Sequence, residues 1–259
     1  MKHHVSHRLT QVSSGLIVAF IAGLGCLLGA APLGAQTVRL HGAISLSKSV
    51  AEQKSVIETQ TGLQLEIVGN GAGRGLADLI AGRADIALVS GSIKGVADAL
   101  NKEKPGSLDT TGLQSTPLPS VRMLFVINPS AGVKSLTEAQ AREVLTGGVT
   151  NWKDVGGADL PIKVVLPFAG DGVRVTVQEQ ILNGADFVKD AVLRNSAKDI
   201  PPVIKQLPGS VSCLSEKNAT GLTTVEYEKP IHISTLLVTK GEPAGDIKKV
   251  VDAVKGLVK

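Results

Sequence analysis

The order of strand and helix patterns between Val38 and Gly91 constrains the fold most. Alternating apolar residues predict strands in "TVRLHG", "LQLEIVG" and "ADIALVSG". Helix patterns separate them, the first stopping at Gly62 and the second, "LADLIAG", stopping at Gly82. This order implies parallel strands joined by right-handed crossovers. The sequence therefore predicts an α/β fold.

A second strand–helix set follows a polar stretch, 102–120, that is rich in helix and strand breakers and is predicted to be a loop. Ser135 and Glu138 have the spacing of a capping box, and Gly147 ends the predicted helix. The later segments "PIKVVLPF", "VRVTVQEQIL", "IHISTLLVTKG" and "AGDIKKVVDAVKGLV" are predicted as strand, helix, strand and helix.

The first 35 residues have the pattern of a secretory signal peptide. Lys2 and Arg8 precede the apolar run Gly15–Ala31, and small residues follow to Ala35. We expect cleavage near Ala35 and a periplasmic or otherwise secreted protein. A retained membrane anchor is the alternative, because the run is near the lower length limit for spanning a bilayer. The residues before Cys26 match lipoprotein processing poorly, so lipidation is the minor alternative.

Composition excludes several function classes. Loss of the first 35 residues removes two cations and no acids, which lowers the formal net charge from +4 to +2. No basic block suited to nucleic acid remains. Aromatic residues make up 2% of the chain, too few for a stacking surface. Cys213 is then the one cysteine, so neither an intramolecular disulfide nor a Cys-x-x-Cys metal site can form. We predict no metal and no cofactor.

A run of alternating glycines, Gly69 to Gly75, lies between a predicted strand and a predicted helix. The uncovered N–H groups of such a loop, with the helix dipole, attract an anion. The run matches neither the dinucleotide pattern nor a P-loop, and a tight turn with close backbone packing is the alternative. "HGAIS" and "AGDGVR" are two further strand-to-helix loops. Three such loops can converge at a cleft at the carboxyl ends of the strands.

On these segments the chain resembles the phosphate-type periplasmic solute-binding proteins of ABC transporters, class II. "NGAGRGLADLIAGRADIALVSG" is similar to the family's glycine loop, helix and strand. "INPSAGVKSLTEAQAREVLTGGVTNWKDVGGADLPIKVV" is the most specific match. The resemblance runs from about Val38 to the C-terminus. It implies a two-lobed class II periplasmic binding protein fold with a ligand cleft between the lobes. Residues 36–122 and 223–259 would form lobe 1, and 123–222 lobe 2.

The resemblance also implies a ligand site at the three loops, although this chain departs from the family's pattern there. A first loop that usually reads Gly-Ser-Thr-Thr is Gly-Ala-Ile-Ser here. In the third loop Asp171 replaces a serine and Val173 a threonine, and an arginine often found before that loop has no counterpart. The expected ligand-binding residues are Ala43, Ile44, Ser45, Gly71, Ala72, Gly73, Arg74, Ser90, Gly170, Asp171, Gly172, Val173 and Arg174.

Asp171 has two interpretations. As the N-cap of the following helix, its carboxylate would accept the N–H groups that a phosphate would use. As a selector, it would repel dianions and accept hydrogen bonds from a protonated or cationic ligand. Both interpretations oppose ordinary phosphate binding, unless Arg74 and Arg174 face inward and offset the charge. We therefore expect weak or absent phosphate binding by the natural chain.

Three other residues have weaker signals. Trp152 is predicted to be a packing anchor, and Cys213 to be buried and inert. His41 lies beside the first loop and either reaches the cleft or is an exposed or hydrogen-bonded histidine.

The sequence thus predicts a secreted solute-binding protein, not an enzyme, that captures phosphate or a related small oxyanion. It would act as a monomer and pass its ligand to the permease of a membrane ABC transporter. The alternative is a degenerate binding-protein-like domain that acts as a sensory or interaction module without phosphate binding. A phosphatase-like enzyme is disfavoured, because no metal constellation, nucleophile–base pair or G-x-S-x-G elbow is visible.

Overall fold

The computed structural model describes residues 36–103, 105–106 and 108–258. The expected signal peptide and Cys26 lie outside these residues. Among the described helices, none is both long enough and apolar enough to cross a membrane.

Strands and helices alternate along the chain. The first set comprises β1 (Thr37–Gly42), α1 (Ile44–Glu52), α2 (Lys54–Thr61), β2 (Gln64–Gly69), α3 (Ala72–Ile80), β3 (Ile86–Ser90) and α4 (Ile93–Glu103). The middle comprises β4 (Leu113–Ile127), β5 (Ser135–Leu136), α5 (Glu138–Thr146), β6 (Lys163–Pro167), α6 (Gly172–Gln180), β7 (Val192–Arg194), α7 (Ile200–Gln206), β8 (Ser210–Ser215) and α8 (Glu216–Ala219). The last elements are β9 (Thr223–Tyr227), β10 (Ile231–Lys240) and α9 (Gly245–Leu257).

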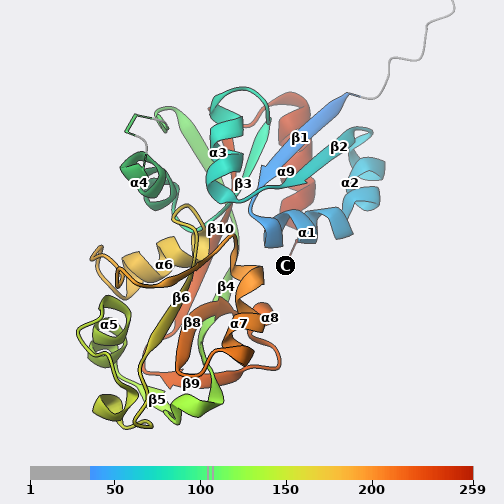
Figure 1. Ribbon diagram of the computed structural model, residues 1–259. Coiled ribbons are helices and arrows are strands. Elements are labelled where there is room, and N and C mark those ends of the chain that lie inside the picture. The colour runs from blue at the N-terminus through green and yellow to red at the C-terminus, as the bar shows by residue number, and fades with distance from the viewer. Residues whose placement is uncertain (1–35, 104, 107, 259) are drawn as a thin grey trace, which may run out of the picture. The chain divides into compact units, whose positions relative to one another are not determined.

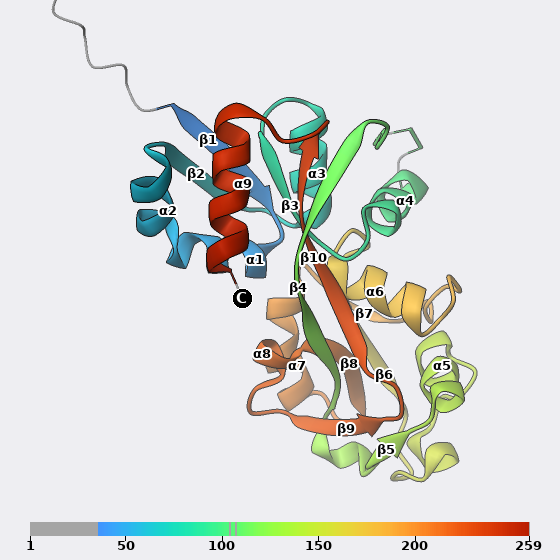
Figure 2. The same ribbon diagram turned by 180° about the vertical axis from the view of Figure 1, so that it is seen from behind.

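The strands join in the order β2-β1-β3-β10-β4-β8-β6-β7, and β9 pairs with β4 and β5. β1 is parallel to both β2 and β3, as the strand–helix order predicts. β6 is likewise parallel to β8 and β7. The long antiparallel strands β4 and β10 run between the two groups of elements, as Figures 1 and 2 show. The α/β fold class predicted from the sequence is confirmed.

Two separate hydrophobic cores divide the described residues. The first contains Leu40, Leu76 and Leu88, with Val250 and Val254 of α9 covering one face of the sheet. The second contains the following fully buried side chains, among others: Phe125, Trp152, Val165, Ile181 and Leu214. β4 contributes Leu118 to the first core and Met123 to the second. The lobe boundary at 122/123 stays a prediction, and this division of β4 supports it.

The chain returns from the second core to the first, and the expected boundary for this return is at Thr223. The packing of β9 and β10 fits that boundary less well than the packing of β4 fits the boundary at 122/123. Val225 and Ile231 pack in the second core, whereas Leu237 and Val238 pack in the first. A register shift between Ile233 and Thr235 lies between these two pairs. The packing therefore favours a later crossing, within β10.

Two local predictions were wrong. Residues 102–120 are not one loop, because α4 runs to Glu103 and β4 begins at Leu113. Prolines are tolerated in this part of β4 because it pairs with β10 alone, β8 and β9 joining β4 only from Met123 onward. The α5 cap is also two residues later than expected: Thr137 and Gln140 form the capping box, and Ser135 is in β5.

Candidate functional site

A cavity of about 340 Å³ lies where the first and third predicted loops meet the crossing strands. Residues from both hydrophobic cores line it, so it is a cleft between the two lobes. Its lining comprises Ala43, Ile44, Ser45, Leu46, Lys48, Ser49, Gly71, Ala72, Ser90, Pro119, Val121, Asp171, Gly172, Val173, Ser196, Ala197, Lys198, Ser215, Lys217, Asn218, Ile233, Thr235 and Val258. Nine of the thirteen expected ligand-binding residues are among them.

Two helices begin at this cavity without side-chain caps. Ala43 is the N-cap of α1 and Gly71 that of α3, and neither side chain accepts a hydrogen bond from the first turn. The leading N–H groups of an α-helix have no partner inside the helix. The first turns of α1 and α3 therefore bring backbone donors and the positive ends of two helix dipoles to the cavity.

The third helix, α6, begins differently. The Asp171 side chain accepts the Val173 N–H at 2.9 Å through Oδ1 and the Ala197 N–H at 3.3 Å through Oδ2. The N-cap interpretation of Asp171 is thus what the geometry shows. Burial raises the pKa of this carboxyl, and the two backbone N–H groups oppose that rise only in part. Asp171 therefore removes two backbone donors from the set available to a bound anion.

Positive charge lines the cavity from three exposed lysines that sequence reasoning missed: Lys48, Lys198 and Lys217. Within the described residues none of them forms an ion pair with a carboxylate, and Asp171 is the one acidic side chain in the lining. No sequence motif marks these lysines, because they come from three separate helical segments. Among the described residues no group of three or more metal-ligating side chains gathers.

Hydroxyl groups also line the cavity, and three of them belong to buried residues: Ser90, Ser196 and Thr235. Ser90, at the end of β3, is 7% exposed, and its hydroxyl forms no hydrogen bond in the described part of the chain. The Thr235 hydroxyl, by contrast, donates to the Pro119 carbonyl at 2.6 Å. Ser90 is therefore a buried polar group that a ligand can satisfy.

The glycine run serves mainly close packing. A Cβ on Gly75 would lie 2.4 Å from the His41 carbonyl oxygen, and one on Gly73 would lie 2.4 Å from Leu100 Cδ1. Gly71 has a φ of +101°, which favours glycine. The packing interpretation thus accounts for Gly73 and Gly75, and Gly71 alone of the three reaches the cavity.

The other expected residues lie outside the cavity lining: Gly73, Arg74, Gly170 and Arg174. The exposed Arg74 guanidinium lies 5.8 Å from the centre of the Phe168 ring. Arg174 stacks over Phe187 at 5.5 Å and donates to the Pro167 carbonyl at 3.3 Å. Both guanidinium groups thus lie over phenylalanine rings, outside the cavity lining.

The three weaker candidates also lie outside the lining. Trp152 is fully buried and donates its indole N–H to the Gly209 carbonyl at 2.9 Å, as a packing anchor does. Cys213 is buried, and burial raises the pKa of its thiol. His41 is buried beside Asp78, with Nδ1 2.9 Å from a carboxylate oxygen.

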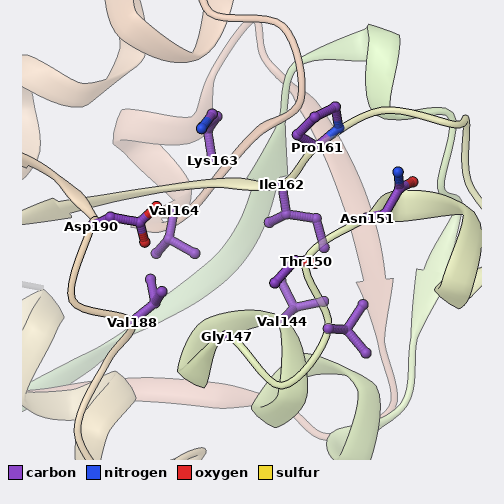
Figure 3. A pocket seen from close by; sticks show the side chains of 11 residues that line it. Val144, Gly147, Thr150, Asn151, Pro161, Ile162, Lys163, Val164, Val188 and Asp190 are labelled. Carbon is purple, nitrogen blue, oxygen red and sulfur yellow. The ribbon is translucent and has the colours of Figure 1, made fainter.

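A second cavity, of about 300 Å³, is lined only by residues of the lobe that contains the second core (Figure 3). Val144, Ile162 and Val188 line it together with Lys163 and Asp190. The Asn151 amide at its edge is already engaged, since its oxygen accepts the Lys153 and Leu160 N–H groups. No described helix begins at this cavity without a side-chain cap, so we place the candidate site in the first cavity.

A family model described as the PBP superfamily domain matches residues 30–255. The chain belongs to the PBP superfamily. The resemblance stated from the sequence and the two-lobed fold class are thereby confirmed.

Individual relatives agree. The phosphate-binding protein PstS of Bacillus subtilis (strain 168) is 27% identical over 241 residues, which cover 84% of this chain and 76% of that protein. The solved structure of a putative phosphate ABC transporter substrate-binding protein with bound phosphate, from Clostridium perfringens, has a TM-score of 0.69 at 21% identity. That likeness covers 84% of this chain and 92% of that one. An ABC-type phosphate transport receptor from Vibrio cholerae has a TM-score of 0.66 at 21% identity, over 85% and 93% of the two chains.

Proposed function

We propose that this PBP superfamily member is an exported solute-binding protein that captures phosphate or a related small oxyanion for an ABC transporter. The observation that carries the proposal is the cavity at which α1 and α3 begin without side-chain caps. The relatives named as phosphate-binding proteins support the choice of ligand class. The first 35 residues would direct export and be cleaved off near Ala35. The permease would be the partner, and no catalysis is part of the proposal.

The charge of the lining supports an anion. Lys48, Lys198 and Lys217 outnumber Asp171, the one acidic residue. Micromolar affinity needs about 8 kcal/mol of net binding free energy, and charge-assisted hydrogen bonds contribute about 1.5–3 kcal/mol each. A few contacts to the first turns of α1 and α3 are therefore enough.

Asp171 makes phosphate binding weaker than such a site allows, and its replacement tests the proposal. The double variant Asp171→Ser with Val173→Thr removes the carboxylate that accepts the N–H groups of residues 173 and 197. It also removes a buried charge and adds two hydroxyl groups. Regaining one charge-assisted hydrogen bond corresponds to roughly a tenfold or greater gain in affinity. We expect weak phosphate binding by the natural chain and that gain in the double variant, measured by titration calorimetry at neutral pH.

The matched control is Asp109→Ser, which removes one negative charge from an exposed loop outside the cavity lining. It should leave the phosphate affinity unchanged. Tight binding by the natural chain would contradict the role given to Asp171. Failure of both proteins to bind phosphate or any related oxyanion would favour the alternative function, a sensory or interaction module, which the self-capped α6 also supports.

A further inference from the structure

The two sides of the cleft are chemically unequal. Backbone donors without side-chain caps come from α1 and α3, which belong to the first core. On the opposite side Asp171 already occupies the N–H groups of Val173 and Ala197. A ligand therefore finds uncapped backbone donors at one end only, whereas Lys198 and Lys217 line the cavity from segments of the second core.

Ser90 lies with that donor side. Its side chain is more than nine-tenths buried, lines the cavity and has no hydrogen-bond partner among the described residues. It is the last residue of β3, which is parallel to β1, the strand that leads into α1. Among the described residues the enclosed side-chain polar atoms without a partner are His41 Nε2 and Asn70 Oδ1, so the Ser90 hydroxyl is open to the cavity and a ligand can reach it. Ser90 is thus a second, independent indication of a polar ligand group at this end.

Part of the wall is apolar, which a bare oxyanion does not require. Val121 of β4 and Ile233 of β10 are register partners on the crossing strands, and both line the cavity. Val173 and Val258 contribute further methyl groups from α6 and from the residue after α9. Pockets for organic ligands have volumes of about 300–1,000 Å³ and mostly apolar linings. The volume of about 340 Å³ falls within that range.

We propose that the cleft binds an organic oxyanion with a phosphoryl head and a short apolar substituent. The head lies at the first turns of α1 and α3 beside Ser90, and the substituent lies against Val121, Ile233 and Val173. The proposal rests on the proposed function, and narrows its ligand from oxyanions in general to those that carry an apolar group. It also gives a reason for Val173 where the family's loop has a hydroxyl: a methyl group covers the substituent.

A series of alkylphosphonates tests this by titration calorimetry on the purified protein. Inorganic phosphate, methylphosphonate, propylphosphonate and butylphosphonate share the charged head and differ in apolar area. Each methylene group that becomes buried should tighten binding about fourfold. We therefore expect the order butyl, propyl, methyl, phosphate, from tightest to weakest.

The variant Val121→Thr tests whether the apolar group of the ligand lies against the crossing strands. Val121 is 37% exposed, so this near-isosteric change is compatible with folding. The variant should reduce the ratio of the methylphosphonate to the butylphosphonate dissociation constant several-fold, because a hydroxyl replaces one methyl of the wall. The matched control, Val56→Thr, makes the same change on the exposed face of α2 outside the cavity and should leave that ratio unchanged.

The outcomes separate this inference from the proposed function. Phosphate that binds as tightly as butylphosphonate, or more tightly, overturns the inference and leaves the proposed function standing. Binding that tightens with chain length but with the same ratio in Val121→Thr overturns the placement on the crossing strands. No binding of any of these oxyanions by a protein with a cooperative thermal unfolding transition overturns both.

Discussion

At the scale of single residues, the polar cluster around Asp78 shows what sequence reasoning left open. The Asp78 carboxylate accepts hydrogen bonds from Asn70 at 2.8 Å and Arg83 at 2.8 Å, and lies 2.9 Å from His41 Nδ1. Burial raises the pKa of Asp78, but the hydrogen bonds from His41, Arg83 and Asn70 outweigh it and lower the pKa overall. His41 has the residue type of a site ligand, yet its partner is a carboxylate within its own lobe.

This cluster predicts acid-sensitive stability. Asp78→Asn should lower the free energy of unfolding by about 1–3 kcal/mol at neutral pH, because charged hydrogen bonds are lost. Since the folded pKa lies below the unfolded value of about 3.9, the natural chain's advantage persists above that value. It should fall as the pH drops through the folded pKa. Urea unfolding of both proteins from neutral pH to about pH 3 measures the difference.

Asp98→Asn is the control, because Asp98 is exposed and, among the described residues, pairs only with Lys94 four residues earlier on the same helix. Exposed pairs of this kind contribute about 0.3–0.5 kcal/mol. A difference between Asp78→Asn and the natural chain that is independent of pH would show that the carboxylate does not stabilise the fold in its ionised form.

At the scale of elements, the start of α5 shows why local patterns fix an element more firmly than its ends. The sequence offers two overlapping capping patterns, Ser135 with Glu138 and Thr137 with Gln140. The structure selects the second, with Gln140 N–H donating to Thr137 at 3.2 Å and Thr137 N–H donating to Gln140 at 3.0 Å. Ser135 instead pairs with Glu226 of β9. That pairing is distant in sequence, so no local pattern reveals it.

The strand β4 is a second case in which a pairing distant in sequence overrides a local pattern. Pro117 and Pro119 predict a loop, but the register with β10 holds this segment extended. By contrast, strands with clear alternation, such as β1 and β2, and the helix ends at Gly62 and Gly147 were predicted correctly, because φ above zero at these glycines is a local requirement.

Alanine variants at the two candidate N-caps of α5 show which of them stabilises the helix. Thr137→Ala removes the side-chain acceptor of the cap and should lower the free energy of unfolding by about 0.5–2 kcal/mol. Ser135→Ala should change it by less than about 0.5 kcal/mol, the usual range for an exposed site away from special contacts. Denaturant unfolding of the two variants measures this. Equal effects, or a larger effect at Ser135, would contradict the assignment of the cap.

At the scale of the whole molecule, α6 ties together the two cores. Val177 packs in the second core, whereas Val175, on the same helix, packs in the first. Close contacts surround Val175: a Cβ on Gly95 of α4 would lie 2.5 Å from its Cγ1, and one on Gly91 would lie 3.6 Å away. Ser92 adds a hydrogen bond to Glu179 at 2.5 Å. The two-lobed fold was predicted from family resemblance, but this contact was not, because no residue pattern in α6 distinguishes one core from the other.

Variants at these two valines therefore distinguish an effect on the stability of the fold from an effect on the arrangement of the lobes. Val175→Ala and Val177→Ala remove the same atoms from buried positions in one helix, and each should lower the free energy of unfolding by about 0.5–3 kcal/mol. Only Val175→Ala weakens the contact between α6 and the first core, so only this variant should separate the lobes. Small-angle scattering of the ligand-free proteins should show a larger radius of gyration for Val175→Ala and an unchanged one for Val177→Ala. Because the cavity is lined from both lobes, Val175→Ala should also weaken oxyanion binding. An unchanged radius in both variants would mean that the Val175 contact does not hold the lobes in place.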